Sequence, residues 1–320
     1  MQTDTNGAPS PFSGGEQAVR RGSWPRHDPL AALGGAKCLA CGAPAWRGGY
    51  PHDTRFDGAG YRFFACAGCG AHFINPVPDA ATLARMYAPD AYHQAFYADD
   101  GRANHDTMIT HLRAHLTDGA RVLDYGCGNG DFLRAALAAG FLAQGAEFGA
   151  SAADAAAERS GASVFDLMRG DWRDADEWDA IHLGDVIEHM TDPLPTLAGI
   201  VARLRPGGVL AAQGPLELNG SLIGMCVRAW ARAKAARGQQ GSFIPWHVLY
   251  FDARAQRALF DRLGLHPIAW QVHEDGWPYS HHGGARGMIA RMGVALARLP
   301  GLRGRWGNRF VALYRKPAAG

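Results

Sequence analysis

The sequence predicts an α/β fold in which a small N-terminal module precedes a doubly wound sheet of seven strands. From residue 120 onward, short apolar segments alternate with segments of helical periodicity, and a glycine-rich turn follows the first strand. Before residue 79, two Cys-x2-Cys pairs stand close together. Alternating strands and helices are typical of parallel sheets with crossover helices. At 320 residues and 47% hydrophobic content, the chain has room for one large core and a smaller module.

The strands are expected where short apolar runs stand between turn residues, at 121–125, 142–148, 164–168, 180–184, 209–213, 267–271 and 310–315. Crossover helices are expected where apolar residues recur at helical spacing, at 130–139, 152–160, 193–204 and 253–263. The same spacing predicts two connecting helices, at 79–87 and 101–116.

These elements divide the chain into four parts. Residues 1–34 lack apolar periodicity and contain several prolines, so we expect a disordered tail. A metal-binding module at 35–78 and a helical connector at 79–118 follow. One α/β domain occupies 119–320.

The charge of the chain is nearly balanced, with a formal net charge of +2 and a pI near 8.3. This is too mild for a typical nucleic-acid-binding protein. Acidic residues are absent from 220 to 251 and again after Asp275, while basic residues continue through both segments. Each segment is either a solvated surface or a contact for an anionic substrate, a phosphate or a membrane surface. A basic helix is expected at 222–237, within the first of these segments. It is either a lid that binds a phosphate or a solvated helix.

The sequence favours a cytoplasmic protein. No apolar run reaches the roughly 18 residues that a membrane span needs, and the N-terminal residues are polar, unlike a signal peptide. Four of the six cysteines fall in tight pairs, a usage that suits metal binding in a reducing compartment. We therefore expect no membrane span, and peripheral membrane contact stays open.

The paired cysteines are Cys38-x2-Cys41 and Cys66-x2-Cys69. Each Cys-x2-Cys turn directs two sulfurs at one point, and two such turns complete a tetrahedral zinc site. A module of this size needs the metal in order to fold, so a zinc-ribbon-like module with structural Zn²⁺ is the leading interpretation. Redox use of the thiols and a module without bound metal are the alternatives.

The glycine turn joins the first expected strand to its helix and carries Gly126, Gly128 and Gly130. A backbone that turns this sharply takes positive φ angles, and a side chain there would block the approach of a ligand. The following helix presents free N–H groups to that ligand. The turn alone is a weak signal, because dinucleotide-binding dehydrogenases share it and a purely structural turn is also compatible with it. Glu147, at the end of the second strand, can accept both hydroxyls of a ribose.

Four segments, in this order along the chain, distinguish between the classes of protein that share a glycine turn. They are the glycine turn at 122–130, Ala146-Glu147-Phe148, the stretch at 178–193, and Leu204-Arg205-Pro206-Gly207-Gly208. Together they closely resemble the class I methyltransferases that use S-adenosylmethionine (SAM), in the branch that includes ubiquinone-type and small-molecule methyltransferases. The resemblance covers roughly residues 121–315. It implies a Rossmann-like sheet with strand order 3-2-1-4-5-7-6, in which strand 7 is antiparallel.

The resemblance also implies the residues that hold SAM, namely Asp124, Gly126, Gly128, Gly130, Glu147, Phe148, Asp171, Trp172, Gly184 and Asp185. Asp124 and the glycines would surround the methionine end and the ribose, whose hydroxyls Glu147 would bind. Phe148 would flank the adenine, and Asp171 would lie near its amino group. Asp171 is equally compatible with a helix N-cap, and Trp172 with plain packing. The segment 184–189 would lie across the sulfonium and the acceptor.

The N-terminal cysteines carry a second resemblance. Bacterial SAM methyltransferases of the polysaccharide and secondary-metabolite type often begin with Cys-x2-Cys, then Cys-x2-Cys-Gly, an aromatic residue and Pro-x-Pro. This chain reads Cys69-Gly70-Ala71-His72-Phe73-Ile74-Asn75-Pro76-Val77-Pro78 at the corresponding place. Some ribosomal-RNA methyltransferases also carry an N-terminal zinc module, which leaves nucleic acid open as a partner.

Methyl transfer needs an acceptor aligned with the sulfonium and, where the acceptor bears a proton, a base. In the family that the chain resembles, the segment after strand 5 and a later histidine face the acceptor, and these correspond to 213–217 and His247. A neutral imidazole titrates near the working pH, so His247 is the preferred base, although it is also suited to pinning the following helix. His189 is the second candidate, with fixing the loop before Pro193 as its alternative role. Tyr250 and Glu217 are further candidates.

The sequence thus predicts a SAM-dependent methyltransferase that acts at oxygen or carbon of a small-molecule or sugar acceptor, including nucleotide- or lipid-linked ones. An RNA methyltransferase guided by the zinc module is the first alternative. It is disfavoured because the module is not strongly basic and no Asn-Pro-Pro-Tyr-like signature follows the fourth strand. A SAM- or zinc-dependent interaction protein without catalysis is the second alternative, and the intact glycine turn argues against it.

Overall fold

The computed structural model describes residues 36–47, 53–86, 105–173, 177–237, 246–276 and 283–318. The expected tail at 1–34 and residues 87–104 of the connector lie outside these ranges. In the first part of the chain the elements are β1 (Ala36–Lys37), β2 (Pro44–Arg47), β3 (Thr54–Phe56), β4 (Ala59–Cys66), β5 (His72–Asn75), α1 (Ala80–Met86) and α3 (Asp106–Arg113).

The α/β domain follows with β6 (Arg121–Tyr125), α4 (Asp131–Ala138), β7 (Leu142–Glu147), α5 (Ala150–Ser160), β8 (Val164–Asp166), β9 (Trp178–Gly184), α6 (Pro193–Ala202), β10 (Leu204–Pro215), α7 (Leu222–Ala236), β11 (Leu249–Tyr250), α8 (Ala253–Asp261), β12 (His266–His273), α9 (Gly284–Ala297) and β13 (Arg309–Arg315). Two short 3-10 helices, η1 (Asp171–Arg173) and η2 (Ile187–His189), lie between these elements.

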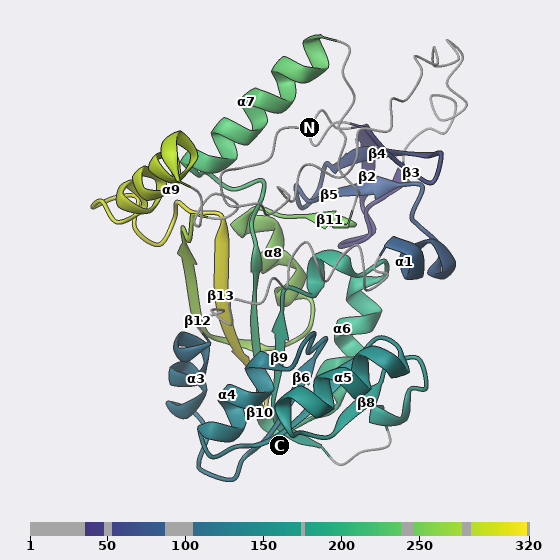
Figure 1. Ribbon diagram of the computed structural model, residues 1–320, viewed down its shortest axis with the longest axis vertical. Helices are drawn as coiled ribbons and strands as arrows, with labels where there is room; N and C mark the ends of the chain where they lie inside the picture. The colour runs from purple at the N-terminus through teal and green to yellow at the C-terminus, as the bar shows by residue number, and fades with distance from the viewer. Residues whose placement is uncertain are drawn as a thin grey trace.

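All seven strands expected after residue 120 are present and form one sheet in the order β12-β13-β10-β9-β6-β7-β8 (Figure 1). The pairs from β8 to β10 are parallel, whereas β13 is antiparallel to both of its neighbours. When only the seven strands of this sheet are numbered in chain order, β6 is strand 1 and β13 is strand 7. Starting at the β8 edge, their order in the sheet is then 3-2-1-4-5-7-6, which is the order that the resemblance implies. The expected α/β fold with a doubly wound sheet is therefore confirmed.

The core of the large domain lies on both faces of this sheet. Successive strand residues point to opposite faces, so Val122 belongs to the cluster formed with α3, α4 and α5, whereas Leu123 belongs to the cluster that includes α6 and α8. Ala180 and Ile181 on β9 divide in the same way. Two buried faces explain why the strands read as continuous apolar runs in the sequence.

The N-terminal module has a second sheet, in the order β1-β2-β4-β5-β11, with β3 paired to β4. Its last strand, β11, comes from the segment between α7 and α8 of the large domain and pairs with β5 through Leu249↔Phe73 and Tyr250↔His72. The module core is continuous with the α6 and α8 face of the large sheet. In Figure 1 this small sheet lies above α6, at the upper right. The module is thus joined to the large domain through a shared sheet and a shared core.

Some elements differ from the expectation. The helix expected at 193–204 ends at Ala202, because Leu204 already pairs with Trp178 of β9. The helix expected in the basic segment 222–237 is present as α7. Helix α9 and strand β11 were not expected from the sequence. Among the described residues, no helix is long and apolar enough to cross a membrane.

Candidate active site

The glycine turn leads from the carboxyl end of β6 into α4. Gly126, Gly128 and Gly130 have φ angles of 76°, 55° and 81°, in the left-handed region that only glycine adopts freely. A Cβ at Gly126 would lie 2.6 Å from Cγ2 of Val186, so a side chain there has no room. The turn therefore requires glycine for its conformation and for the close approach of the segment after β9.

Asp124 lies at the end of β6, two residues before Gly126. Its Oδ1 accepts a hydrogen bond from Nδ1 of His182 at 2.7 Å, and both side chains are buried. The His182 ring also stacks on Phe132 of α4, with ring centroids 3.8 Å apart. Asp124, predicted as a cofactor residue, is therefore held by a histidine of the neighbouring strand, a partner that sequence reasoning missed.

Glu147 ends β7 beside the glycine turn. Its two carboxylate oxygens accept hydrogen bonds from the backbone N–H groups of Gly128, at 2.6 Å, and of Phe148, at 2.7 Å. Burial raises the pKa of this carboxyl, while the two backbone hydrogen bonds oppose the shift. Phe148 next to it is 60% exposed. The acidic group and the exposed ring thus lie side by side at the carboxyl edge of the sheet, where open α/β sheets bind their ligands.

Asp171 and Trp172 lie in η1, after β8. Asp171 is exposed, whereas Trp172 is buried and packs edge-on against Tyr125 of the glycine turn, with ring centroids 5.3 Å apart. The indole Nε1 of Trp172 is buried and has no hydrogen-bond partner among the residues that the structure describes. A buried donor of this kind beside the turn is compatible with a polar ligand atom.

Gly184 and Asp185 stand at the carboxyl end of β9. Asp185 has a φ of 54°, a conformation that Asp tolerates better than most residues. Its two carboxylate oxygens lie 2.6 and 2.8 Å from Nη2 of Arg309, the first residue of β13. Arg309 is 124 residues away in the sequence, so this pairing could not be foreseen from local pattern.

Glu188, His189 and His247 form a cluster whose metal-ligating atoms all lie within 4.8 Å of one another. His189 donates from Nδ1 to the carbonyl oxygen of Trp246 at 2.9 Å, and its Nε2 lies 3.9 Å from Oε1 of Glu188. His247 Nδ1 lies 2.5 Å from Oε1 of Glu217. Nδ1 is engaged in both rings, so a proton exchanged by His247 would be carried at its Nε2.

The protonation of the cluster follows from burial and from charge. Burial lowers the pKa of His247, but the charge and hydrogen bond of Glu217, with the charges of Glu188 and Asp185, raise it to about 8. Burial and the neighbouring His247 lower the pKa of His189 to about 3. Burial and the charge of Asp185 raise the pKa of Glu188 to about 8. His189 is thus a neutral imidazole throughout the physiological range.

His247 is connected to the N-terminal module through the next residue. Val248 donates its N–H to the carbonyl of Glu188 at 2.8 Å and accepts a hydrogen bond from the N–H of Ile74, in β5, at 3.0 Å. Leu249 and Tyr250 then pair with β5. Hydrogen bonds to the module on one side and to the 3-10 helix η2 of the large domain on the other therefore fix the segment that carries His247.

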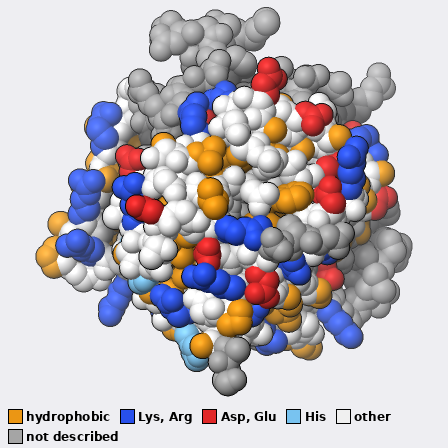
Figure 2. Space-filling model, turned by 90° about the horizontal axis from the view of Figure 1, so that it is seen from below, with side chains coloured by type: hydrophobic (Ala, Val, Ile, Leu, Met, Phe, Trp, Pro, Cys, Tyr) orange, Lys and Arg blue, Asp and Glu red, His pale blue; other side chains and the backbone are white. Residues whose placement is uncertain are grey.

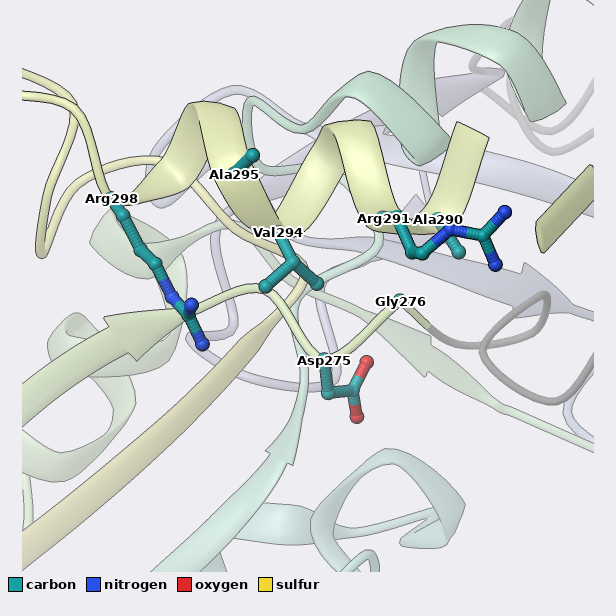
Figure 3. A pocket seen from close by; sticks show the side chains of 7 residues that line it. All are labelled: Asp275, Gly276, Ala290, Arg291, Val294, Ala295 and Arg298. Carbon is teal, nitrogen blue, oxygen red and sulfur yellow. The ribbon is translucent and has the colours of Figure 1, made fainter. Parts of the chain in front are cut away.

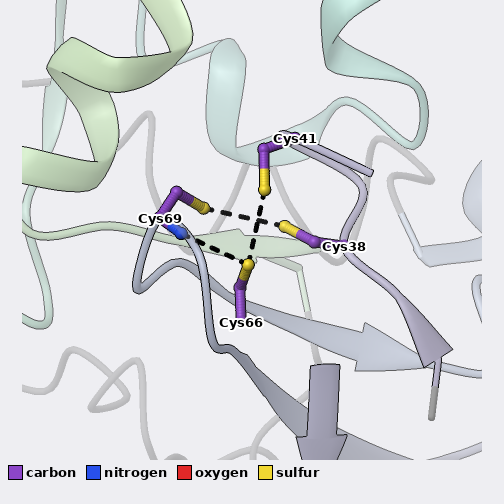
Figure 4. A group of neighbouring side chains, drawn as sticks. All are labelled: Cys38, Cys41, Cys66 and Cys69. Atoms are coloured by element: carbon purple, nitrogen blue, oxygen red, sulfur yellow. Dashed lines mark hydrogen bonds between the residues drawn. The ribbon is translucent and has the colours of Figure 1, made fainter. Parts of the chain in front are cut away.

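The four paired cysteines meet at one point in the module (Figure 4). Sγ of Cys38 lies 3.8 Å from Sγ of Cys69, and Sγ of Cys41 lies 3.4 Å from Sγ of Cys66. None of the four is in a disulfide. Four thiolates around one zinc ion, each at about 2.3 Å, have sulfur–sulfur distances of roughly 3.8 Å. The donor set and its spacing therefore fit a tetrahedral zinc ion.

The fold and the glycine turn are typical of enzymes that bind a nucleotide-containing cofactor. Comparison with known proteins identifies the class of enzyme. A family model described as a methyltransferase domain matches residues 94–269, which is more than half of the chain. The chain belongs to this methyltransferase family and is a class I SAM-dependent methyltransferase. A search among curated proteins finds no match.

Several solved structures are similar in fold. A SAM-dependent methyltransferase from Archaeoglobus fulgidus is 14% identical with a TM-score of 0.45, over 69% of this chain and 98% of that chain. The N-methyltransferase NodS from Bradyrhizobium japonicum with bound S-adenosylhomocysteine is 17% identical with a TM-score of 0.42, over 74% and 97%. A complex of the Haloferax volcanii Trm112 methyltransferase activator with a putative methyltransferase is 17% identical with a TM-score of 0.45, over 75% and 96%. These similarities are too distant to indicate an acceptor.

Proposed function

We propose that the enzyme transfers the methyl group of SAM to an oxygen or carbon atom of a small-molecule or sugar acceptor, with His247 as the general base. The observation that carries the proposal is the contact of 2.5 Å between Nδ1 of His247 and Oε1 of Glu217. Because this carboxylate holds Nδ1, Nε2 of His247 is free to accept a proton from the acceptor. A carboxylate that orients an imidazole in this way is a recurrent arrangement in acid–base catalysis.

The cofactor side of the site is formed by the glycine turn and Glu147. When bound, SAM supplies a methyl group activated by its sulfonium. The left-handed glycines leave the backbone open to the ligand, Glu147 binds the ribose hydroxyls, and the exposed ring of Phe148 flanks the adenine. Asp171 and Trp172 complete the adenine side. Asp124 acts through His182 as a buried support of the turn.

The acceptor side is formed by the segment after β9 and the residues around His247. His189 is neutral, and its Nδ1 donates to the carbonyl oxygen of Trp246, which fixes the ring beside His247. The second oxygen of Glu217, Oε2, is buried without a partner among the described residues. This unpartnered oxygen beside the base favours a substrate with a hydroxyl group, as sugars have.

We further propose that Cys38, Cys41, Cys66 and Cys69 bind one structural Zn²⁺ ion. Zinc would stabilise the turn between β1 and β2, the turn between β4 and β5 and, through β5, the strand β11 that follows His247. The metal would in this way keep His247 in place without taking part in methyl transfer.

Among the alternatives, RNA methylation is less well supported than a small acceptor. The β5 edge of the module sheet is covered by β11 and is not open to a nucleic acid. A non-catalytic SAM- or zinc-dependent interaction protein does not account for the half-buried His247–Glu217 pair beside the cofactor side. The proposal places the enzyme in the cytoplasm.

The experiment that tests the proposal is a screen of acceptors, nucleotide sugars and lipid-linked sugars first and structured RNA as a separate arm. Mass spectrometry would detect a SAM-dependent gain of one methyl group. A His247→Gln variant that still binds SAM is the matched control and should lose the product. Methylation of RNA, with none of the small acceptors, would overturn the acceptor assignment.

A further inference from the structure

Helix α9 has two opposite faces of different character. The face that packs inward carries only small residues: Gly287, Ala290, Gly293 and Ala297 are buried. The opposite face carries Met288, Met292 and Ala295, and Leu299 follows two residues after the end of the helix. The four residues succeed one another at intervals of four, three and four residues and are all exposed. Residues at this spacing lie on one side of a helix. We refer to these four residues as the α9 stripe.

The large side chains of the α9 stripe are well exposed, at 53% for Met288, 51% for Met292 and 48% for Leu299. The neighbouring helix α7, which packs against α9, adds Met225 and Trp230 to the exposed apolar side chains. Soluble proteins seldom gather so many large apolar side chains on neighbouring elements of the surface. The exposed apolar side chains of α7 and α9 therefore indicate a surface that binds an apolar partner.

Basic side chains flank this apolar surface. Arg286 and Arg291 on α9 and Arg298 at its C-cap are exposed, and no acidic residue follows Asp275 in the sequence. On α7, the ammonium group of Lys234 lies 4.2 Å from the centre of the Trp230 ring. At the left edge of Figure 2, where α9 lies, blue basic and orange hydrophobic side chains stand next to one another. Neither α7 nor α9 contains an acidic residue, and Asp275, which follows β12, lines a cavity together with Arg291 and Arg298. Apolar side chains among cations are typical of helices that lie on anionic membranes.

We propose that the α7 and α9 surface docks on a bilayer that contains anionic phospholipids. A second copy of the chain would bring two basic surfaces together, and a nucleic acid would leave the methionines and Leu299 without a partner. A bilayer satisfies both components, because the apolar side chains enter the acyl boundary while the arginines contact the phosphates. This inference goes beyond the proposed function and does not depend on it.

The docking surface is connected to the active site. A cavity of about 300 Å³ lies between α9 and the end of β12 (Figure 3), and it is lined by Asp275, Gly276, Ala290, Arg291, Val294, Ala295 and Arg298. Asp275 lies 3.5 Å from Arg309, and Arg309 holds Asp185 at the end of β9. Docking through α9 would therefore bring the acceptor side of the enzyme close to the membrane surface.

The test measures binding of the full chain to sedimented vesicles of phosphatidylcholine, with and without phosphatidylglycerol. Binding is expected only with phosphatidylglycerol and should weaken as salt is added. The combined variant Arg286→Gln/Arg291→Gln/Arg298→Gln should bind roughly 100-fold more weakly, since each basic residue near the surface contributes about five-fold. The combined variant Met288→Ser/Met292→Ser/Leu299→Ser should bind at least about ten-fold more weakly.

Matched controls come from other surfaces. The variant Arg134→Gln/Arg254→Gln/Arg262→Gln removes three exposed arginines, one each from α4, α8 and the C-cap of α8. Leu142→Ser removes an exposed apolar side chain from β7. Both controls should bind vesicles as the unmodified chain does. Circular dichroism and SAM titration check that every variant is folded. The proposal would be overturned by absence of vesicle binding, by equal loss in the controls, or by self-association that the α9 variants abolish.

Discussion

His182 donates a hydrogen bond from Nδ1 to Oδ1 of Asp124 across 2.7 Å, in a position where both side chains are buried. This contact joins β9 to β6 directly before the glycine turn. Replacing His182 by Phe keeps an aromatic ring against Phe132 but leaves a buried carboxyl without its donor. We expect a loss of about 2 kcal/mol in the free energy of unfolding, measured by urea denaturation.

The control for this experiment is Asp124→Asn, which keeps an oxygen that can accept from His182. This variant should lose less stability than His182→Phe. Equal stability of His182→Phe and the unmodified protein would show that the hydrogen bond does not support the turn.

The cofactor site can be tested by SAM titration calorimetry. Glu147→Ala removes the carboxylate proposed to bind the ribose, and we expect at least about ten-fold weaker binding, because hydrogen bonds to a charged group contribute about 1.5–3 kcal/mol. Gly126→Arg should abolish binding, since even a Cβ at this position would lie 2.6 Å from Cγ2 of Val186. Asp171→Asn serves as a conservative comparison on the adenine side. Unchanged affinity in Glu147→Ala would remove the ribose assignment.

The rate of methyl transfer should depend on pH through His247. With a pKa of about 8, His247 is mostly protonated at pH 7 and cannot accept a proton, so kcat/KM should rise with pH and level off above about 8. The Glu217→Gln variant removes the charge that raises this pKa, so the rising limb should move to lower pH. The His247→Gln variant should lose roughly 100-fold or more in kcat. An unshifted pH profile in Glu217→Gln would contradict the proposed role of this pair.

The zinc proposal makes two measurable statements. Metal analysis of the purified protein should find one zinc ion per chain, and Cys66→Ser should lose the metal and lower the melting temperature. Because β11 pairs with β5 directly after His247, loss of zinc should lower kcat more than it weakens SAM binding. Cys226→Ser, a cysteine of α7 outside the module, is the control and should behave as the unmodified protein. A stably folded protein without zinc would contradict the site.

The large sheet was predictable because its signals are local. Each strand of the large sheet is an apolar run bounded by turn residues, and the left-handed turn between β6 and α4 can be formed freely only by glycine. Among the described helices and strands after residue 120, two escaped prediction. β11 is two residues long and has no pattern of its own, and α9 contains several glycines that weaken its intrinsic helix propensity.

The candidate site was predictable in part. His247, His189 and Glu217 were candidates from their place in the motifs, whereas the roles of Glu188, His182 and Arg309 were not recognised. Glu188 is the residue before the candidate His189 in the sequence, and this adjacency could have indicated that it belongs to the site. The sequence around Arg309 offered no such signal, since Arg309 is one of many arginines in an acid-free segment. It lies beside Asp185 only because β13 pairs antiparallel with β10 in the folded sheet.

By itself, the sequence determined the α/β class, the glycine turn, the acidic end of the second strand and the two cysteine pairs. These features are encoded in spacings of a few residues, which fix backbone conformation and side-chain period locally. Only the tertiary structure decided that β11 completes the module sheet, that His247 meets Glu217 and that Arg309 meets Asp185. Such contacts depend on how whole elements pack, because residues far apart in the chain come together only when the core closes.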